Sequence, residues 1–321
     1  MKSRRPSWEH LEELLQLTDR KGVAALDRQQ LQELGRLYRT ASADLSRARA
    51  LKVGSEVQTY LNNLVVRAHN QVYQTSQSRW KDLLYFLYEG FPKLVREHII
   101  YLMISISLFA VPAVGSFIAV QDNIDFAQLE IAKGHPLVPD ELWNMIEKHQ
   151  MWTDLAEKQS PTAFGLIATN NIWVAIRAFV FGITLGVGTV YVLLTNGLSI
   201  GTIFGVCHAY GMSSRLLAFV APHGVLELSA IFISGAAGLL MGKSILFPGQ
   251  YRRVDAFRQA GKKAMGLFGG TVPLLLVAGC IEGFLSPRTD VAPEYKFMVS
   301  LCTLIFLVLY LFVPRQTKSH S

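Results

Sequence analysis

Charged residues are scarce in this chain. Asp, Glu, Lys and Arg make up 17% of its 321 residues, against about 25% in an average soluble protein. Hydrophobic residues make up 50%, and the mean hydropathy is +0.28. This composition excludes an ordinary soluble globular protein and predicts a membrane protein. Because residues 1–97 are markedly polar, we expect an all-α chain in which an N-terminal cytosolic helical bundle precedes a polytopic membrane domain.

Cysteine is also rare. Cys207, Cys280 and Cys302 are widely spaced and fall in apolar segments, which excludes a disulfide framework and a cysteine-based zinc motif. The run Gly186-Val187-Gly188 lies inside an apolar segment with no strand before it, so it is not a dinucleotide-binding fingerprint. The sequence therefore predicts no cofactor, no metal and no catalytic residues.

No apolar run occurs near the N-terminus, so no signal peptide is expected. Residues 1–97 hold 16 Lys and Arg against 11 Asp and Glu; because the two signs are interleaved, nucleic-acid binding is not expected.

Residues 80–97 combine aromatic and basic side chains and predict an interfacial elbow helix, with a break at Pro92. Apolar residues at helical spacing predict three amphipathic helices. These residues are Trp8, Leu11, Leu14 and Leu15, then Leu31, Leu34, Tyr38 and Leu45, then Val53, Val57, Tyr60, Leu61, Leu64, Ala68 and Val72.

Six apolar segments follow, and each is close to the ~20 residues that cross a bilayer. They are residues 98–120, 171–194, 198–220, 224–247, 264–286 and 296–313. Segment 121–170 holds 3 basic against 8 acidic residues, whereas 243–263 is strongly basic. The positive-inside rule therefore places 121–170 outside and 243–263 inside. Residues 98–313 form the membrane domain, 314–321 form a cytosolic tail, and both termini are cytoplasmic.

Small and amide residues mark the expected helix contacts and ends. Asn170, Asn171 and Asn196 are expected to be caps or turn formers, with a tight turn at 195–197. Glycines recur at i, i+4 spacing, which permits close approach of membrane helices. Packing within one chain is favoured over a homo-oligomer face. These glycines are Gly182, Gly186, Gly197, Gly201, Gly205, Gly235, Gly238 and Gly242.

Ionisable residues interrupt the apolar segments. His223 and Glu227 share one helix face, and placing each in hydrocarbon costs at least ~2.5–3.5 kcal/mol. The expected topology brings Arg177, Arg215 and Glu282 to the same outer half of the membrane. We expect structural pairing in the first place, with Arg177 as the preferred partner of Glu227 and Arg215 as the second choice. An ion or proton pathway is the second alternative. A metal or catalytic site is the third, because no second histidine has ligand spacing.

The apolar region also resembles a known family. The resemblance rests on Asn171-Ile172-Trp173, on Phe181 to Gly186, on Asn196 to Gly201, on the His-Gly-x-x-Glu run from His223 to Glu227, and on Gly235-Ala236-Ala237-Gly238. In these motifs the chain is similar to the stage II sporulation protein M family, over about residues 95–313.

The resemblance implies a multi-pass protein of the bacterial inner membrane without enzymatic activity. The founding member is a scaffold that recruits peptidoglycan-degrading enzymes, and other members are encoded beside MoxR-type ATPases and RDD-type membrane proteins. We therefore expect a non-enzymatic subunit or scaffold of an envelope-associated complex. Its partners would be the lipid bilayer and envelope proteins, such as a MoxR-type ATPase system or cell-wall enzymes. The alternative is an ion or small-solute channel or transporter that uses His223, Glu227 and Glu282.

Overall fold

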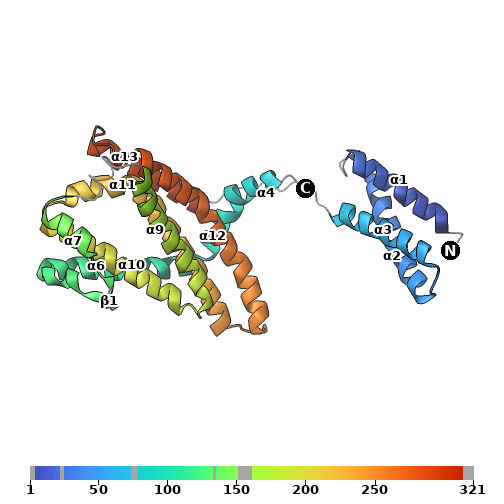
Figure 1. The fold of residues 1–321 in the computed structure, drawn as a ribbon, viewed down its shortest axis with the longest axis horizontal. Coiled ribbons are helices and arrows are strands. Elements are labelled where there is room, and N and C mark those ends of the chain that lie inside the picture. Colours follow the sequence, from blue (N-terminus) through green and yellow to red (C-terminus); the bar gives the residue numbers. More distant parts are fainter. Residues whose placement is uncertain (1–3, 22–24, 74–78, 133–134, 151–160, 314–321) are drawn as a thin grey trace. The chain divides into compact units, whose positions relative to one another are not determined.

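The protein forms two compact units, residues 1–84 and 85–321 (Figure 1). The computed structural model describes residues 4–21, 25–73, 79–132, 135–150 and 161–313. The boundary at residue 84 precedes the expected end of the polar domain at residue 97. The reason is that the elbow belongs to the membrane unit: Phe91 is fully buried among the membrane helices, and its ring fills the space where Gly270 has no side chain.

The N-terminal unit is a three-helix bundle with its own core. Its helices are α1 (Arg5–Lys21), α2 (Arg28–Ala50) and α3 (Ser55–Tyr73). A capping box begins α2: Asp27 accepts from the backbone of Gln30 at 2.7 Å, and the Gln30 side chain accepts in return. Inside the core, the indole of Trp8 donates to the buried carboxylate of Asp44 at 3.0 Å. Most apolar residues of the three predicted faces form or border this core. Leu31 and Tyr60 are instead exposed, and the side chain of Val72 lies outside the described part of the chain.

The elbow is one nearly continuous helix. It runs through α4 (Arg79–Tyr85), a π-helical turn η3 (Phe86–Gly90) and α5 (Phe91–Glu97). Pro92 falls in the first turn of α5, where its missing N–H is tolerated, so the expected break at Pro92 is wrong. The chain turns instead at His98, whose φ of −114° departs from helical geometry.

The membrane unit is built around one long central helix, α11, which packs against every other long helix of the unit. The membrane helices are α6 (Ile99–Asp122), α9 (Pro161–Val180) with the 3-10 turn η5 (Phe181–Ile183), α10 (Val187–Ala209), α11 (Ser213–Leu246), α12 (Arg253–Phe284) and α13 (Pro293–Phe312). Five of them are long and apolar enough to cross a membrane, and residues Asn170–Ile183 form a shorter apolar helix. The predicted fold class, all-α with membrane helices and an N-terminal helical region, is confirmed.

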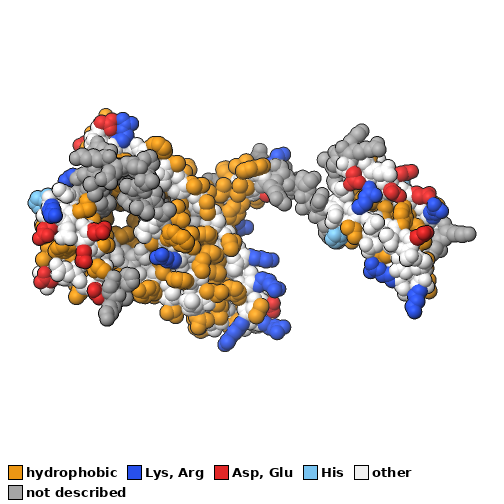
Figure 2. Space-filling view, in the orientation of Figure 1, with side chains coloured by type: hydrophobic (Ala, Val, Ile, Leu, Met, Phe, Trp, Pro, Cys, Tyr) orange, Lys and Arg blue, Asp and Glu red, His pale blue; other side chains and the backbone are white. Residues whose placement is uncertain are grey.

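The two ends of the membrane unit differ in charge. Figure 2 shows hydrophobic side chains over its helices and basic side chains gathered where α11 passes into α12. The acidic side chains gather at the opposite end. That these two ends face opposite sides of a membrane stays a prediction of the positive-inside rule.

Two expected turns lie elsewhere. Residues 195–197 are in the middle of α10, where Asn196 donates its amide to the Val192 carbonyl at 2.7 Å. The reversal occurs at Leu185 and Gly186, both with positive φ. The other is the connection at 221–223 between the expected spans 198–220 and 224–247: its Pro222 lies inside α11, and α10 and α11 join at residues 210–212 instead. The Asn196 side chain satisfies its hydrogen bonds within α10, so it does not require a turn there. Pro222 is accommodated because membrane helices tolerate proline in their interior.

The glycine pairs lie at contacts between helices of this chain. A Cβ on Gly182 would collide with the backbone of Gly238, and a Cβ on Gly242 with that of Gly186. Gly197 and Gly201 contact the backbone of α6 in the same way, and Gly205 and Gly235 contact side chains. These contacts bring α9 and α10 against α11 and α6 at backbone distance.

A short segment closes one end of the membrane unit. It consists of η4 (Ile124–Gln128), a two-stranded antiparallel hairpin of β1 (Glu130–Ala132) and β2 (His135–Pro136), and α7 (Asp140–Glu147). Ile146 is fully buried against the ends of α10 and α11, and Trp143 meets Tyr210 edge to face. The amphipathic segment expected near 139–158 is thus a helix in its first half that packs on protein; residues 151–160 lie outside the described chain.

Candidate functional site

Three ionisable side chains converge between α11 and α12. His223 and Glu227 lie one turn apart on α11, and Glu282 reaches them from the end of the antiparallel α12. One nitrogen or oxygen of each residue lies within 4.8 Å of those of the other two. The side chains are buried, with exposed fractions of 3%, 6% and 1% in that order. A group of two carboxyls and an imidazole is therefore enclosed within the membrane unit.

The imidazole of His223 is oriented by a serine beyond the end of α12. Its Nδ1 lies 2.7 Å from the Ser286 hydroxyl, which itself donates to the Ile281 carbonyl at 3.4 Å. The hydroxyl can accept from Nδ1 or donate to it, according to the tautomer of the ring. The other ring nitrogen, Nε2, faces Glu227 and lies 3.8 Å from its Oε2.

Glu227 is held by an amide from α9. Nδ2 of Asn171 donates to Oε2 of Glu227 at 2.6 Å. Asn171, expected to be a cap, lies well inside α9, as does its exposed neighbour Asn170. The cap assignment is wrong because both amides lie far from the ends of that helix. Asn171 instead links a third helix to the cluster.

Glu282 is the least satisfied member of the group. Both of its carboxyl oxygens are buried, and no hydrogen-bond donor among the described residues reaches either one. A buried polar atom left without a partner costs about 1–3 kcal/mol. A buried cation lies in the same corner of the unit: Lys296, in the first turn of α13, donates to the Ser286 carbonyl at 2.8 Å.

The two arginines lie outside this cluster. Arg177 is exposed on α9 and lines a recess of about 480 Å³ together with residues that include Ile131 and Tyr191. Arg215 is exposed in the first turn of α11 and donates to the His149 carbonyl at 3.4 Å. The expected pairing of Glu227 with either arginine is therefore not what the structure shows. Asn171 takes that position.

Sequence reasoning missed three members of the polar group. Asn171 was assigned to a helix end, and Ser286 carries no signal in the sequence. Lys296 was visible as a charge at the edge of the last apolar segment. The sequence could not show that Lys296 lies near the cluster, because its position depends on the path of the chain between α12 and α13.

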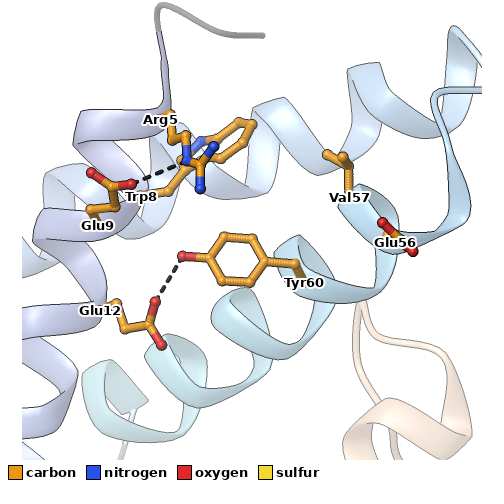
Figure 3. Close-up of a pocket in the computed structure, with 7 residues that line it drawn as sticks. All are labelled: Arg5, Trp8, Glu9, Glu12, Glu56, Val57 and Tyr60. Carbon is orange, nitrogen blue, oxygen red and sulfur yellow. Dashed lines mark hydrogen bonds and ion pairs between the residues drawn. The ribbon is translucent and has the colours of Figure 1, made fainter.

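The N-terminal unit holds a separate recess, shown in Figure 3. Its volume is about 560 Å³, and the side chains that line it come from α1 and α3. The rings of Trp8 and Tyr60 lie 6.4 Å apart, and the Tyr60 hydroxyl donates to Glu12 at 2.8 Å. Burial, and next the bond to Glu12, raise the pKa of Tyr60 to about 12. The recess is lined by Arg5, Trp8, Glu9, Glu12, Glu56, Val57 and Tyr60.

Comparison with known proteins bears on both units. A model of the family described as "Stage II sporulation protein M" matches residues 101–287, and a "Domain of unknown function (DUF8413)" matches residues 1–74. An uncharacterized protein of Methanocaldococcus jannaschii is 28% identical over 127 residues, which cover 39% of this chain and 71% of that protein. No solved structure matches the chain. Because the first model spans more than half of the chain and includes His223, Glu227 and Glu282, the chain belongs to the stage II sporulation protein M family.

Proposed function

We propose that this protein is a non-enzymatic membrane subunit that holds a partner protein at the membrane, as a scaffold of an envelope-associated complex. The observation that carries the proposal is the N-terminal recess. It belongs to a unit with its own hydrophobic core, and it is lined by the exposed ring of Tyr60, the edge of the buried Trp8 and three carboxylates. A partner segment that carries a basic residue next to an apolar one would complement this surface.

The membrane unit supports the same function because it is closely packed. Backbone contacts at Gly182 and Gly238 hold α9 and η5 against α11, and Gly242 of α11 contacts the following turn at Gly186. Rigid packing of this kind suits an anchor. The family resemblance implies the bacterial inner membrane, and the charge separation between the two ends of the unit supports the proposal that both termini are cytoplasmic. The family resemblance favours a MoxR-type ATPase system or cell-wall enzymes as the partner.

Affinity purification from native membranes tests this function. Glu56 lines the recess, and Glu33 is a glutamate on α2 that does not line it. We expect wild-type protein and Glu33→Lys to retain a stoichiometric partner and Glu56→Lys to lose it. Loss of the partner from both variants, or its absence from wild-type protein, would contradict a docking role for the recess.

A channel or transporter is the second candidate, because three ionisable groups meet at His223, Glu227 and Glu282 within the membrane unit. Flux in proteoliposomes tests it. Under this alternative, Glu227→Gln folds with normal abundance and abolishes an ion- or pH-dependent flux. Under the scaffold function, wild-type protein gives no flux above that of empty liposomes, and partner binding depends on the N-terminal recess alone.

A further inference from the structure

The cluster between α11 and α12 has the composition of a metal site. An imidazole and two carboxylates are donors that first-row divalent cations accept, and two carboxylates balance the charge of one such cation. The spacing of His223 and Glu227 supplies two donors on one helix face. The third, Glu282, comes from a distant part of the sequence, which is why ligand spacing alone gave no indication of the site.

The donors are oriented by neighbours in the way that metal ligands are. The Ser286 hydroxyl lies 2.7 Å from Nδ1 of His223, and this contact turns Nε2 toward the cluster, 3.8 Å from Oε2 of Glu227. Asn171 holds Glu227 through Oε2. Hydrogen bonds that fix the tautomer of a histidine and the position of a carboxylate are characteristic of residues around a metal centre.

The unpartnered carboxyl of Glu282 is an independent indication that the cluster binds a ligand. Its side chain is 1% exposed, it extends into the cluster, and no described donor reaches either oxygen. A hydrophobic contact cannot satisfy a buried carboxyl, and the hydrogen-bonding atoms of Ser286 and Asn171 are already directed to His223, Ile281 and Glu227. A cation at the centre of the three side chains would satisfy both carboxyl groups at once.

We propose that His223, Glu227 and Glu282 bind one divalent transition-metal cation, of which Zn²⁺ is the best match. The single imidazole favours Zn²⁺ over Mg²⁺ and Ca²⁺, which prefer oxygen ligands alone. Three protein ligands leave one coordination position for water or a partner's side chain. The cation would join α11 to α12, and it would join α9 through Asn171. This inference is independent of the scaffold function.

Metal binding by the purified full-length protein tests the proposal. The protein, freed of its affinity tag and placed in lipid nanodiscs, is stripped with EDTA, loaded with Zn²⁺, desalted and analysed for zinc. Glu282→Gln is nearly isosteric, and Glu294→Gln neutralises an exposed glutamate of α13 as the matched control. We expect Glu282→Gln to bind one equivalent less than wild-type protein, and Glu294→Gln to bind as much as wild type. Ser286→Ala should weaken binding about 10–100-fold, as loss of an orienting partner does.

Cobalt gives a second readout that separates the cluster from adventitious sites. Co²⁺ in a site of low coordination number absorbs strongly in the visible range, and this band should form in wild-type protein and be absent in His223→Gln. Zn²⁺ should also raise the melting temperature of wild-type protein and leave that of Glu282→Gln unchanged, even if the variant is less stable at the outset. The proposal is overturned if wild-type protein binds no more zinc than Glu282→Gln.

Discussion

The side-chain amide of Asn171 donates to Oε2 of Glu227 at 2.6 Å, and this bond ties α9 to the central helix α11. The pair is separated by 56 positions in the sequence. It lies at the same helix–helix contact as Gly182 and Gly238, farther along the two helices. The polar bond and the glycine contacts therefore fix one packing arrangement together.

Removal of the amide should destabilise the membrane unit. In Asn171→Leu, Oε2 of Glu227 loses its donor, which should cost about 1–3 kcal/mol. We expect a lower melting temperature in detergent, measured by intrinsic fluorescence. Asn170→Leu is the control, since Asn170 is exposed on the same helix and should melt like wild-type protein. Equal melting of both variants would show that the bond contributes no stability.

The contact at Gly238 should not tolerate a methyl group. A Cβ there would meet the Ala178 carbonyl and the hydroxyl of Thr189, which are themselves joined by a 2.8 Å hydrogen bond. Gly238→Ala should therefore cost about 1–3 kcal/mol through overpacking. At Gly269 a Cβ meets nothing within 4 Å, so Gly269→Ala should be neutral or stabilise by up to about 1 kcal/mol. Thermal melting of the two variants in one detergent compares them. Similar losses in both would contradict close packing at Gly238.

The N-terminal unit should fold alone. A fragment of residues 1–78 should be soluble and helical by circular dichroism, because the unit has its own core. Within it, Leu34→Ala should cost about 2–5 kcal/mol, since Leu34 is fully buried. Leu31→Ala on the same helix should change stability by no more than about 0.5 kcal/mol, because Leu31 is 49% exposed. Urea denaturation gives both values. A fragment without helical structure would refute an independent bundle.

Tyr60 should make this fragment sensitive to alkaline pH. Burial and the bond to Glu12 raise its pKa to about 12 in the folded state, above the ordinary tyrosine value of 10.0. A raised folded pKa means that the folded state retains the proton longer than the unfolded state. The contribution of Tyr60 is therefore complete below pH 10 and is lost as pH rises to about 12. Melting curves of wild-type fragment and Tyr60→Phe across this range should converge as pH rises. Parallel curves would contradict the raised pKa.

The sequence predicted the parts of the fold that depend on local pattern. Helical spacing placed His223 and Glu227 on one face, and apolar length predicted the membrane helices. The parts that depend on tertiary pairing were not predictable. Asn196 was assigned to a turn because asparagine favours turns in water, whereas inside α10 it bonds to its own helix. Arg177 was paired with Glu227 by depth alone, whereas Arg177 is exposed and the buried Glu227 accepts from Asn171.

Membrane topology is the last prediction, and the structure identifies suitable positions to probe. Asp140 and Lys148 are exposed at the acidic end of the membrane unit, and Arg252 is exposed at the basic end, before α12. Cys280 and Cys302 are exposed and Cys207 is buried, so all three are first replaced by alanine or serine. Single cysteines are then introduced at the three positions.

The positive-inside rule predicts the labelling pattern. An impermeant maleimide should modify the cysteines at positions 140 and 148 in intact cells, and the cysteine at position 252 only after the membrane is opened. The tail position Lys318 should behave like 252, although it lies outside the described residues. Four crossings, by α6, α9, α10 and α11, precede position 252, so the six-span topology puts this position and the N-terminal unit on the same side of the membrane. Labelling at 252 in intact cells would therefore reverse the orientation and move the N-terminal recess out of the cytoplasm. Labelling at 140 and 252 alike would mean that the segment between them crosses the membrane an even number of times, so α9, α10 and α11 could not all be spans.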